Sequence, residues 1–178
     1  DSKVHSDTLR PHSAFVYLYR LGELPRIPGL IEQITASTAA SDHRHLSFYV
    51  GSMAVNVWPG EPDDPETEAG GREWILAQNW LTYQQDVFVT PAFAGYVSGH
   101  SGFSRAAAEV MTLFTGSSFF PGGLFSHSIS AGYLNFEAGP TCDLTQQWAT
   151  YSDAADEAGK LRIYGGIHLS PDGGPGRI

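Results

Sequence analysis

Apolar residues recur at helical spacing in four stretches of the chain. In the clearest, 100–114, spacings of three and four residues place five of them on one helical stripe, among alanines of high helix propensity: Phe103, Ala107, Val110, Met111 and Phe114. A second stripe runs through 144–160, where Gly159 is typical of a helix stop. Residues 72–85 and 28–40 give weaker helical patterns. The spacing therefore predicts four helices.

Strand-like alternation is short, and loops are long. Apolar and polar residues alternate only near 46–58 and 87–89. The segment 59–71 holds three prolines and an acidic cluster with almost no apolar residue, so we expect a solvated loop there. Gly, Ser, Pro and Phe mix over 115–143, which indicates irregular backbone anchored by aromatic rings. Together with the helical stretches, these patterns predict a mostly α fold.

Charge and ligand-type residues narrow the function classes. The 178 residues carry 10 basic and 19 acidic side chains, a net charge of −9. Such a chain repels nucleic acid and anionic membranes, so neither is an expected partner. No run of about 18 apolar residues appears, which argues against a membrane span. The one cysteine, Cys142, excludes an internal disulfide and a cysteine-rich metal site. His43 and His45 lack a further ligand at metal-binding spacing, so we expect them at a surface helix end.

We expect a single domain, 1–178, that is a segment of a longer polypeptide. Lys3 and Arg10 follow the first residue closely, and the last residues, SPDGGPGRI, are typical of turns and not of a closing helix. A missing segment of chain, or a second copy in a homo-oligomer, would then complete the core. The compartment stays open, although a soluble protein, secreted or periplasmic, is favoured.

Ser98, Gly99 and His100 stand where a loop enters the clearest helix. Backbone N–H groups at a helix start have no intrahelical partner, and the helix dipole is positive there, which suits an anion. Ser98 adds a hydroxyl donor, Gly99 allows a ligand to approach the backbone closely, and His100 exchanges protons near neutral pH. The alternative is that Ser98 only caps the helix.

Positive charge gathers in two further places of this acidic chain. Lys3 and Arg10 lie near its start, and Arg162 lies six residues before His168. A guanidinium offers a planar fork that matches two oxygens of a tetrahedral oxyanion. Taken singly, such cations are usually only solvated, and a histidine such as His168 is usually structural. Their joint presence favours a binding site.

Three motifs appear in a fixed order along the chain. They are Lys-x6-Arg-Pro from Lys3 to Pro11, Ser-Gly-His at 98–100, and Arg-x5-His-x3-Asp from Arg162 through His168 to Asp172. This series resembles the three-part signature shared by the vanadium-dependent haloperoxidases and the type 2 phosphatidic acid phosphatases. The neighbouring stretches DTLRPHSA and PAFAGYVSGHSGFS are similar to soluble bacterial haloperoxidases. The resemblance implies an all-α helical bundle of the haloperoxidase and acid phosphatase type, of which this chain is the C-terminal part.

The resemblance also implies a vanadate cofactor and gives each motif residue a role. His168 would bind vanadium through an imidazole nitrogen. The remaining donors would hold the equatorial oxygens: Lys3, Arg10, Arg162, the Ser98 hydroxyl and the Gly99 N–H. His100 would hydrogen-bond the apical oxygen and act as general acid and base as peroxide replaces it. Phe93 stands where brominating members often carry histidine, so it would line a chloroperoxidase-like halide pocket.

Three functions are open to such a site. The leading expectation is a vanadate-dependent haloperoxidase that oxidises halide with hydrogen peroxide to hypohalous acid and so halogenates an organic acceptor. The alternative is a soluble acid phosphatase of the same superfamily, in which His168 would be the nucleophile, His100 the leaving-group acid and Asp172 the group that orients His168. The third is a domain that binds phosphate-like anions, or a partner chain, without turnover.

Overall fold

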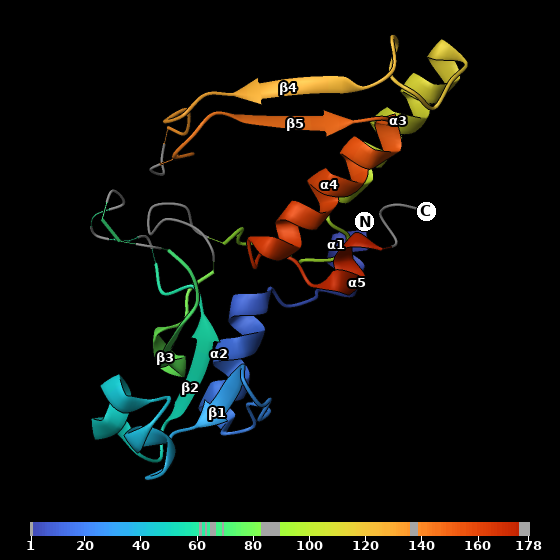
Figure 1. Ribbon diagram of the computed structural model, residues 1–178. Helices are drawn as coiled ribbons and strands as arrows, with labels where there is room; N and C mark the ends of the chain where they lie inside the picture. Colours follow the sequence, from blue (N-terminus) through green and yellow to red (C-terminus); the bar gives the residue numbers. More distant parts are fainter. Residues whose placement is uncertain are drawn as a thin grey trace. The chain divides into compact units, whose positions relative to one another are not determined.

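Two compact units make up the structure, a computed structural model that describes residues 2–60, 62, 64, 67–68, 70–82, 90–135 and 139–174. One unit is Asp1–Pro11 with Gln85–Ile178, and the other is His12–Gln84. Each contains an antiparallel sheet beside its helices (Figure 1). The expected all-α helical bundle is therefore wrong, because the described part of the chain is a mixed α/β structure. The single domain expected over 1–178 stays a prediction.

The His12–Gln84 unit is built on a small antiparallel sheet. Its strands are β1 (Ile31–Gln33), β2 (Met53–Val57) and β3 (Glu73–Leu76), with β2 in the middle. Helix α2 (Pro11–Leu21) packs partly buried side chains against a core of Leu24, Val55 and Ala77. The described 3-10 helices of this unit are η1 (Thr38–Ala40), η2 (Arg44–Tyr49) and η3 (Ala77–Asn79).

Two of the stretches for which the sequence predicts helices contain strands instead. β1 lies within 28–40 and β3 within 72–85, and both pair with β2. Val55 of β2 is buried between its register partners Ile31 and Ile75. An apolar run of three or four residues fits a buried strand as well as a helix, so periodicity alone cannot separate the two. Pairing with β2 decides the outcome.

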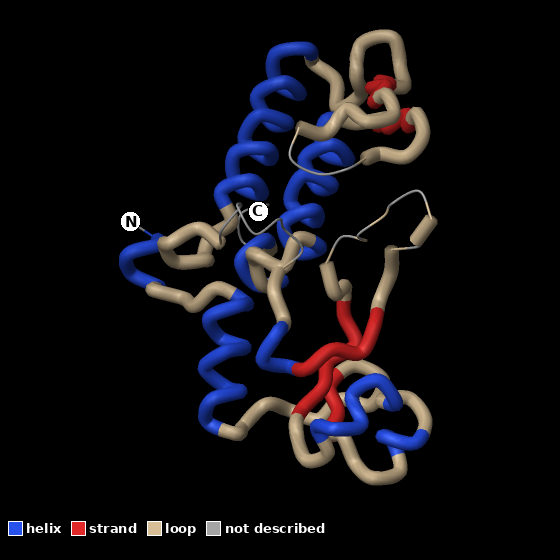
Figure 2. Tube along the Cα trace, turned by 90° about the vertical axis from the view of Figure 1, so that its left-hand side faces the viewer, coloured by secondary structure: helices blue, strands red, loops and turns tan. Residues whose placement is uncertain are grey.

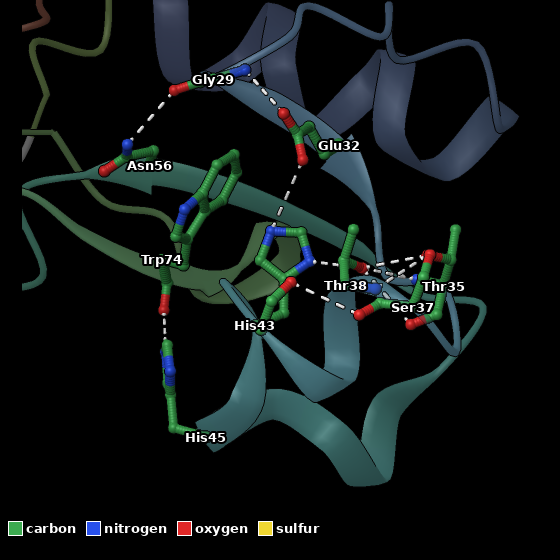
Figure 3. A network of polar contacts seen from close by, with 10 residues as sticks. Gly29, Glu32, Thr35, Ser37, Thr38, His43, His45, Asn56 and Trp74 are labelled. Atoms are coloured by element: carbon green, nitrogen blue, oxygen red, sulfur yellow. Dashed lines mark hydrogen bonds and ion pairs between the residues drawn. The ribbon is translucent and has the colours of Figure 1, made fainter.

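His43 lies in the interior of this unit and not at a surface helix end. Its side chain is fully buried, its Nδ1 lies 3.0 Å from the Thr38 hydroxyl oxygen, and its Nε2 lies 3.7 Å from a Glu32 carboxylate oxygen (Figure 3). The ring also meets Trp74 edge to face, with the ring centroids 4.5 Å apart. His45 is exposed and contacts the Trp74 carbonyl oxygen. The surface prediction is wrong for His43, because its ring finds polar and aromatic partners inside the unit.

In the other unit, two long helices lie side by side (Figures 1 and 2). Helix α3 (Gly99–Thr115) confirms the helix predicted over 100–114, with Ser98 at its N-cap and Gly116, at φ 70°, at its end. It packs against α4 (Tyr151–Tyr164) through a small core of Ala108, Tyr151 and Ala155. None of the helices in the described ranges is long and apolar enough to cross a membrane.

The stretch 144–160 divides into a strand and a helix. Strand β5 (Leu144–Trp148) pairs antiparallel with β4 (Phe125–Ile129), so part of the irregular backbone expected over 115–143 is also a strand. Helix α4 begins at Tyr151, after a capping box in which Thr150 and Asp153 exchange side-chain-to-backbone hydrogen bonds. The cap, and not the apolar stripe, decides where the helix begins.

Gly159 does not end α4, which continues to Tyr164. A Cβ atom at this position would lie 2.8 Å from Ser101 Oγ on α3. Glycine is therefore needed where the two helices approach closely, and its role is packing instead of termination. The remaining described helices of this unit are short: α1 (Ser2–Ser6) and α5 (Ser170–Gly173).

Two sequence predictions fall partly or wholly outside the described residues. In the acidic stretch 59–71, the described positions carry no helix or strand, while 61, 63, 65, 66 and 69 lie outside the description. The strand expected near 87–89 lies wholly outside it. Strand β2 confirms the strand predicted near 46–58, although the first residues of that stretch belong to η2.

Candidate functional site

Segments from the start, the middle and the end of the chain meet in the unit formed by Asp1–Pro11 and Gln85–Ile178. The backbone N–H of Gly95 donates to the Thr8 carbonyl oxygen (3.1 Å), and the N–H of Tyr96 donates to the Thr8 hydroxyl (2.8 Å). The N–H of Ser98 donates to the carbonyl oxygen of Asp172 (2.8 Å). These hydrogen bonds hold the three motif-bearing segments together.

Arg10 is the centre of this meeting point. Its side chain is 4% exposed. Its Nε donates to the Phe93 carbonyl oxygen (2.9 Å) and its Nη1 to the Ile167 carbonyl oxygen (2.8 Å). Nη1 also lies 3.1 Å from Nε2 of His168. Burial is the main reason that the pKa of Arg10 is lowered, while nearby Asp172 acts in the opposite direction. Arg10 thus places a positive charge next to His168.

His168 is buried between a cation and a carboxylate. Its Nδ1 lies 3.1 Å from Asp172 Oδ2, which also accepts the Leu169 N–H (3.0 Å). A guanidinium can only donate, so the contact with Arg10 assigns Nε2 as the acceptor and Nδ1 as the protonated nitrogen. Burial lowers the pKa of His168, although the hydrogen bond to Asp172 acts to raise it. The ring is therefore neutral at pH 7, with a lone pair on Nε2.

Asp172 reaches His168 through the start of a short helix. Leu169 is the N-cap of α5, and Asp172 is the third residue of that helix, where its carboxylate accepts the Leu169 N–H. Pro171, within the first two helical positions, is compatible with this turn. The proline and the two glycines of SPDGG are therefore compatible with a contact between His168 and Asp172, which lie four residues apart in the sequence.

Lys3 and Phe93 lie beside Arg10. Lys3 Nζ donates to the carbonyl oxygens of Ala94 (2.9 Å) and Gly95 (3.2 Å). Both cations also face the Phe93 ring, with Lys3 Nζ 5.1 Å and the Arg10 guanidinium carbon 4.9 Å from its centroid. Partial burial, followed by the nearby charge of Arg10, lowers the pKa of Lys3. The Phe93 side chain itself is 59% exposed.

Ser98 is buried at the N-terminus of α3, and Gly99 and His100 form the first residues of that helix. The Ser98 hydroxyl accepts the Ser101 N–H (3.4 Å), so Ser98 does cap the helix. Its hydroxyl hydrogen is a further donor, and capping does not exclude ligand binding. His100 is exposed, yet loss of water around its ring, and then the charge of Arg162, lower its pKa.

Arg162 lies in the last turn of α4. Its carbonyl oxygen accepts the N–H groups of Ile167 (3.2 Å) and His168 (3.3 Å), which fixes the connection from α4 to the histidine. Its Nε is buried and has no hydrogen-bond partner among the residues that the structure describes. Burial lowers the pKa of Arg162. A buried donor of a cation without a partner is a natural point of attachment for an anionic ligand.

The described charges around His168 are mainly positive. The cations are Lys3, Arg10 and Arg162, and each affects the pKa of another site residue. Asp172 is the carboxylate that contacts His168, and it does so at Nδ1, on the side of the ring away from Nε2. Hydroxyl, guanidinium and ammonium donors around a neutral imidazole suit a small oxyanion.

Two residues of this arrangement carry no sequence signal of their own. Thr8 holds Gly95 and Tyr96 through its carbonyl and hydroxyl oxygens. Gly95 is buried against the Asp172 carboxylate. Threonine and glycine are common loop residues, and their contacts depend on backbone geometry, so neither is found from residue type and spacing.

Comparison with solved structures shows a fold that the chain shares with other proteins. The holo form of a bacterial vanadium-dependent chloroperoxidase matches with a TM-score of 0.57 and 18% identity, over 70% of this chain and 24% of that one. The apo form of a bacterial vanadium-dependent chloroperoxidase matches with a TM-score of 0.57 and 20% identity, over 75% of this chain and 26% of that one. A bacterial vanadium-dependent iodoperoxidase matches with a TM-score of 0.38 and 29% identity, over 57% and 22%. The chain shares its fold with part of the chloroperoxidases and spans about a quarter of their length.

The family model described as "VCPO second helical-bundle domain" matches residues 1–178. The chain therefore belongs to the vanadium haloperoxidase family, and the resemblance seen in the three motifs is confirmed. No curated protein matches the chain in a sequence search. The role of each motif residue remains a prediction.

Proposed function

We propose that this chain carries the oxyanion-binding residues of a vanadate-dependent haloperoxidase, which oxidises halide with hydrogen peroxide. One observation supports this most strongly. His168 is buried, burial lowers its pKa and so favours the neutral ring, and its Nε2 lone pair faces the Arg10 guanidinium while Asp172 holds its Nδ1. A neutral imidazole nitrogen beside fixed positive charge is what a ligand to an anionic metal centre requires.

The described donors fit vanadate in number and chemistry. His168 offers the nitrogen ligand through Nε2. The donors that would hold the oxygens are the side chains of Lys3, Arg10, Arg162 and Ser98 and the N–H of Gly99. The unpaired Nε of Arg162 supports the fit, because a bound oxygen would satisfy it. When bound, vanadate supplies a centre that binds peroxide and activates it toward halide with no change in the vanadium oxidation state.

His100 is the group proposed to move protons. Its lowered pKa keeps the ring neutral at pH 7, so that it is able to accept a proton from hydrogen peroxide and later return one to the departing oxygen. Its exposure gives it access to solvent. Its position in the first turn of α3 places it next to Ser98 and Gly99 in the chain. His100 would therefore affect turnover more than oxyanion binding.

The proposal is tested by measuring halogenation of a phenol dye. Purified protein is loaded with orthovanadate, dialysed, and supplied with hydrogen peroxide and bromide or chloride. We expect dye halogenation that depends on vanadate, peroxide and halide and that excess phosphate suppresses. His168→Ala should abolish both vanadate retention and halogenation. Halogenation that survives in this variant contradicts the proposed coordination. Because Phe93 stands where brominating members often carry histidine, we propose activity with chloride as well as bromide.

Phosphate-ester hydrolysis is the second candidate function. The contact between His168 Nδ1 and Asp172 is also the arrangement of a nucleophilic histidine with an orienting carboxylate. Hydrolysis of p-nitrophenyl phosphate, with vanadate acting only as an inhibitor, would favour this function. Oxyanion binding with neither activity would favour a non-catalytic binding domain.

A further inference from the structure

Gly95 lies at the point where the Lys3 to Arg10 segment meets His168 and Asp172. Its N–H donates to the Thr8 carbonyl oxygen (3.1 Å), and its carbonyl oxygen accepts from Lys3 Nζ (3.2 Å). The residue is buried. Both polar backbone groups of Gly95 thus form hydrogen bonds with the segment that contains Lys3 and Thr8. The position of its absent Cβ lies next to Asp172.

The Asp172 carboxylate occupies the space in which a side chain at position 95 would lie. A Cβ atom built on Gly95 would lie 2.7 Å from Asp172 Oδ2, 3.4 Å from its carboxyl carbon and 3.5 Å from the Leu9 carbonyl oxygen. Glycine is not needed here for its backbone angles, because its φ lies outside the left-handed region. It is needed because a side chain and the carboxylate would compete for the same space.

The oxygen that a Cβ would displace carries the hydrogen bonds of the candidate site. Asp172 Oδ2 lies 3.1 Å from His168 Nδ1 and accepts the Leu169 N–H (3.0 Å). The main chain of Asp172 is held by Ser98, and that of Gly95 by Thr8. If a Cβ is added at position 95, the Asp172 carboxylate therefore has to move away by rotation of its side chain. That rotation breaks its contact with His168.

We propose that Gly95 is a positioning residue, whose missing side chain lets Asp172 Oδ2 hold His168 with the proton on Nδ1 and the lone pair on Nε2. This inference rests on the proposed function for its effect on vanadate binding, although its effect on His168 is independent of any ligand. Gly95 itself makes no bond to the oxyanion. It acts through the carboxylate, which holds the proton on Nδ1 while the Arg10 guanidinium faces the lone pair on Nε2.

The first test locates the imidazole proton. Long-range 1H–15N correlation spectra, with His168 assigned by its loss in His168→Ala, distinguish the two neutral tautomers at pH 8. Wild-type protein should show the proton on Nδ1, and Gly95→Ala should show a mixture with the Nε2-protonated form. A wild-type ring protonated on Nε2 overturns the proposal without any need for the variant.

The second test measures affinity for orthovanadate by equilibrium dialysis. Loss of a group that orients a metal ligand typically costs about 10- to 100-fold in affinity, so Gly95→Ala should raise the dissociation constant by about that factor. Asp172→Asn should have a similar effect. Both changes remove the same interaction. The double variant should therefore bind orthovanadate no more weakly than the single variant with the higher dissociation constant. If the losses of vanadate affinity in the two single variants add up in the double variant, Gly95 does not act through Asp172.

Two matched glycine variants separate positioning from general damage to the fold. In Gly159→Ala the new Cβ meets Ser101 Oγ at 2.8 Å, a clash of the same size that touches neither His168 nor Asp172. In Gly174→Ala, two residues from Asp172, no atom of the described residues other than its chain neighbours lies within 4 Å of the new Cβ. Both should keep the Nδ1-protonated ring. If Gly159→Ala changes the tautomer as much as Gly95→Ala, the assignment of Gly95 is lost.

The outcomes distinguish this inference from the proposed function. If Gly95→Ala changes the tautomer of His168 while the wild-type protein binds no vanadate, the inference is supported and the proposed function is rejected. Vanadate binding that Gly95→Ala leaves unchanged, with the tautomer also unchanged, rejects the inference and leaves the function intact.

Discussion

Replacing Arg10 by alanine should destabilise the protein more than any exposed arginine replacement. The guanidinium is buried and donates short hydrogen bonds to the carbonyl oxygens of Phe93 (2.9 Å) and Ile167 (2.8 Å). Hydrogen bonds from a charged group contribute about 1.5 to 3 kcal/mol each, and a buried acceptor left unpaired has a similar cost. Removing the buried charge recovers part of its desolvation cost. We therefore expect a loss of about 3 kcal/mol in the free energy of unfolding.

Urea denaturation followed by circular dichroism measures this loss. Arg105 is the matched control on the same unit, because it is partly exposed, pairs with Glu109 (2.7 Å) one helical turn away on α3, and makes one long hydrogen bond to the Ser152 hydroxyl (3.3 Å). Arg105→Ala should cost less than about 1 kcal/mol. Arg10→Lys should fall between the two, since an ammonium keeps the charge but not the planar fork. An Arg10→Ala loss no larger than the control would refute the view that Arg10 joins the three segments.

Three further predictions concern catalysis, packing and pH. His100→Ala should lower turnover by about 100-fold while vanadate affinity changes little, which steady-state kinetics and dialysis together measure. Gly159→Ala should cost about 1 to 3 kcal/mol, and adding Ser101→Ala should restore most of it in urea denaturation. Because burial lowers the pKa of His168, the unfolded state binds more protons, so stability should fall below about pH 6.5. Thermal melts should show a smaller fall in His168→Gln.

The sequence predicts a helix or strand correctly where all of its local signals indicate the same element. Helix α3 has an apolar stripe, alanines and a serine cap, and all agree. The strands β1 and β3 are short apolar runs whose state depends on β2, which lies elsewhere in the sequence. Gly159 looks like a stop because the sequence does not show that Ser101 packs against it. Local patterns therefore fail where a tertiary contact decides.

The candidate site shows the same division. Lys3, Arg10, Ser98, His168 and Asp172 have side chains whose type and order carry the family signature, and the structure brings them into one unit. The contacts between Thr8 and Gly95, and those of the carbonyl oxygens that hold Arg10, come from the backbone. A carbonyl oxygen is the same in every residue, so no sequence pattern reveals these contacts. His43 likewise is buried by partners that its neighbours in the sequence do not indicate.

A structure of the protein crystallised with orthovanadate tests the central claim most directly. The account predicts density for vanadate bonded to His168 Nε2, with the side chains of Lys3, Arg10, Arg162 and Ser98 turned toward its oxygens. His168→Ala crystals grown in the same solution should lack this density. Density at another place, or a His168 Nε2 that remains bonded to Arg10 at saturating vanadate, would contradict the account.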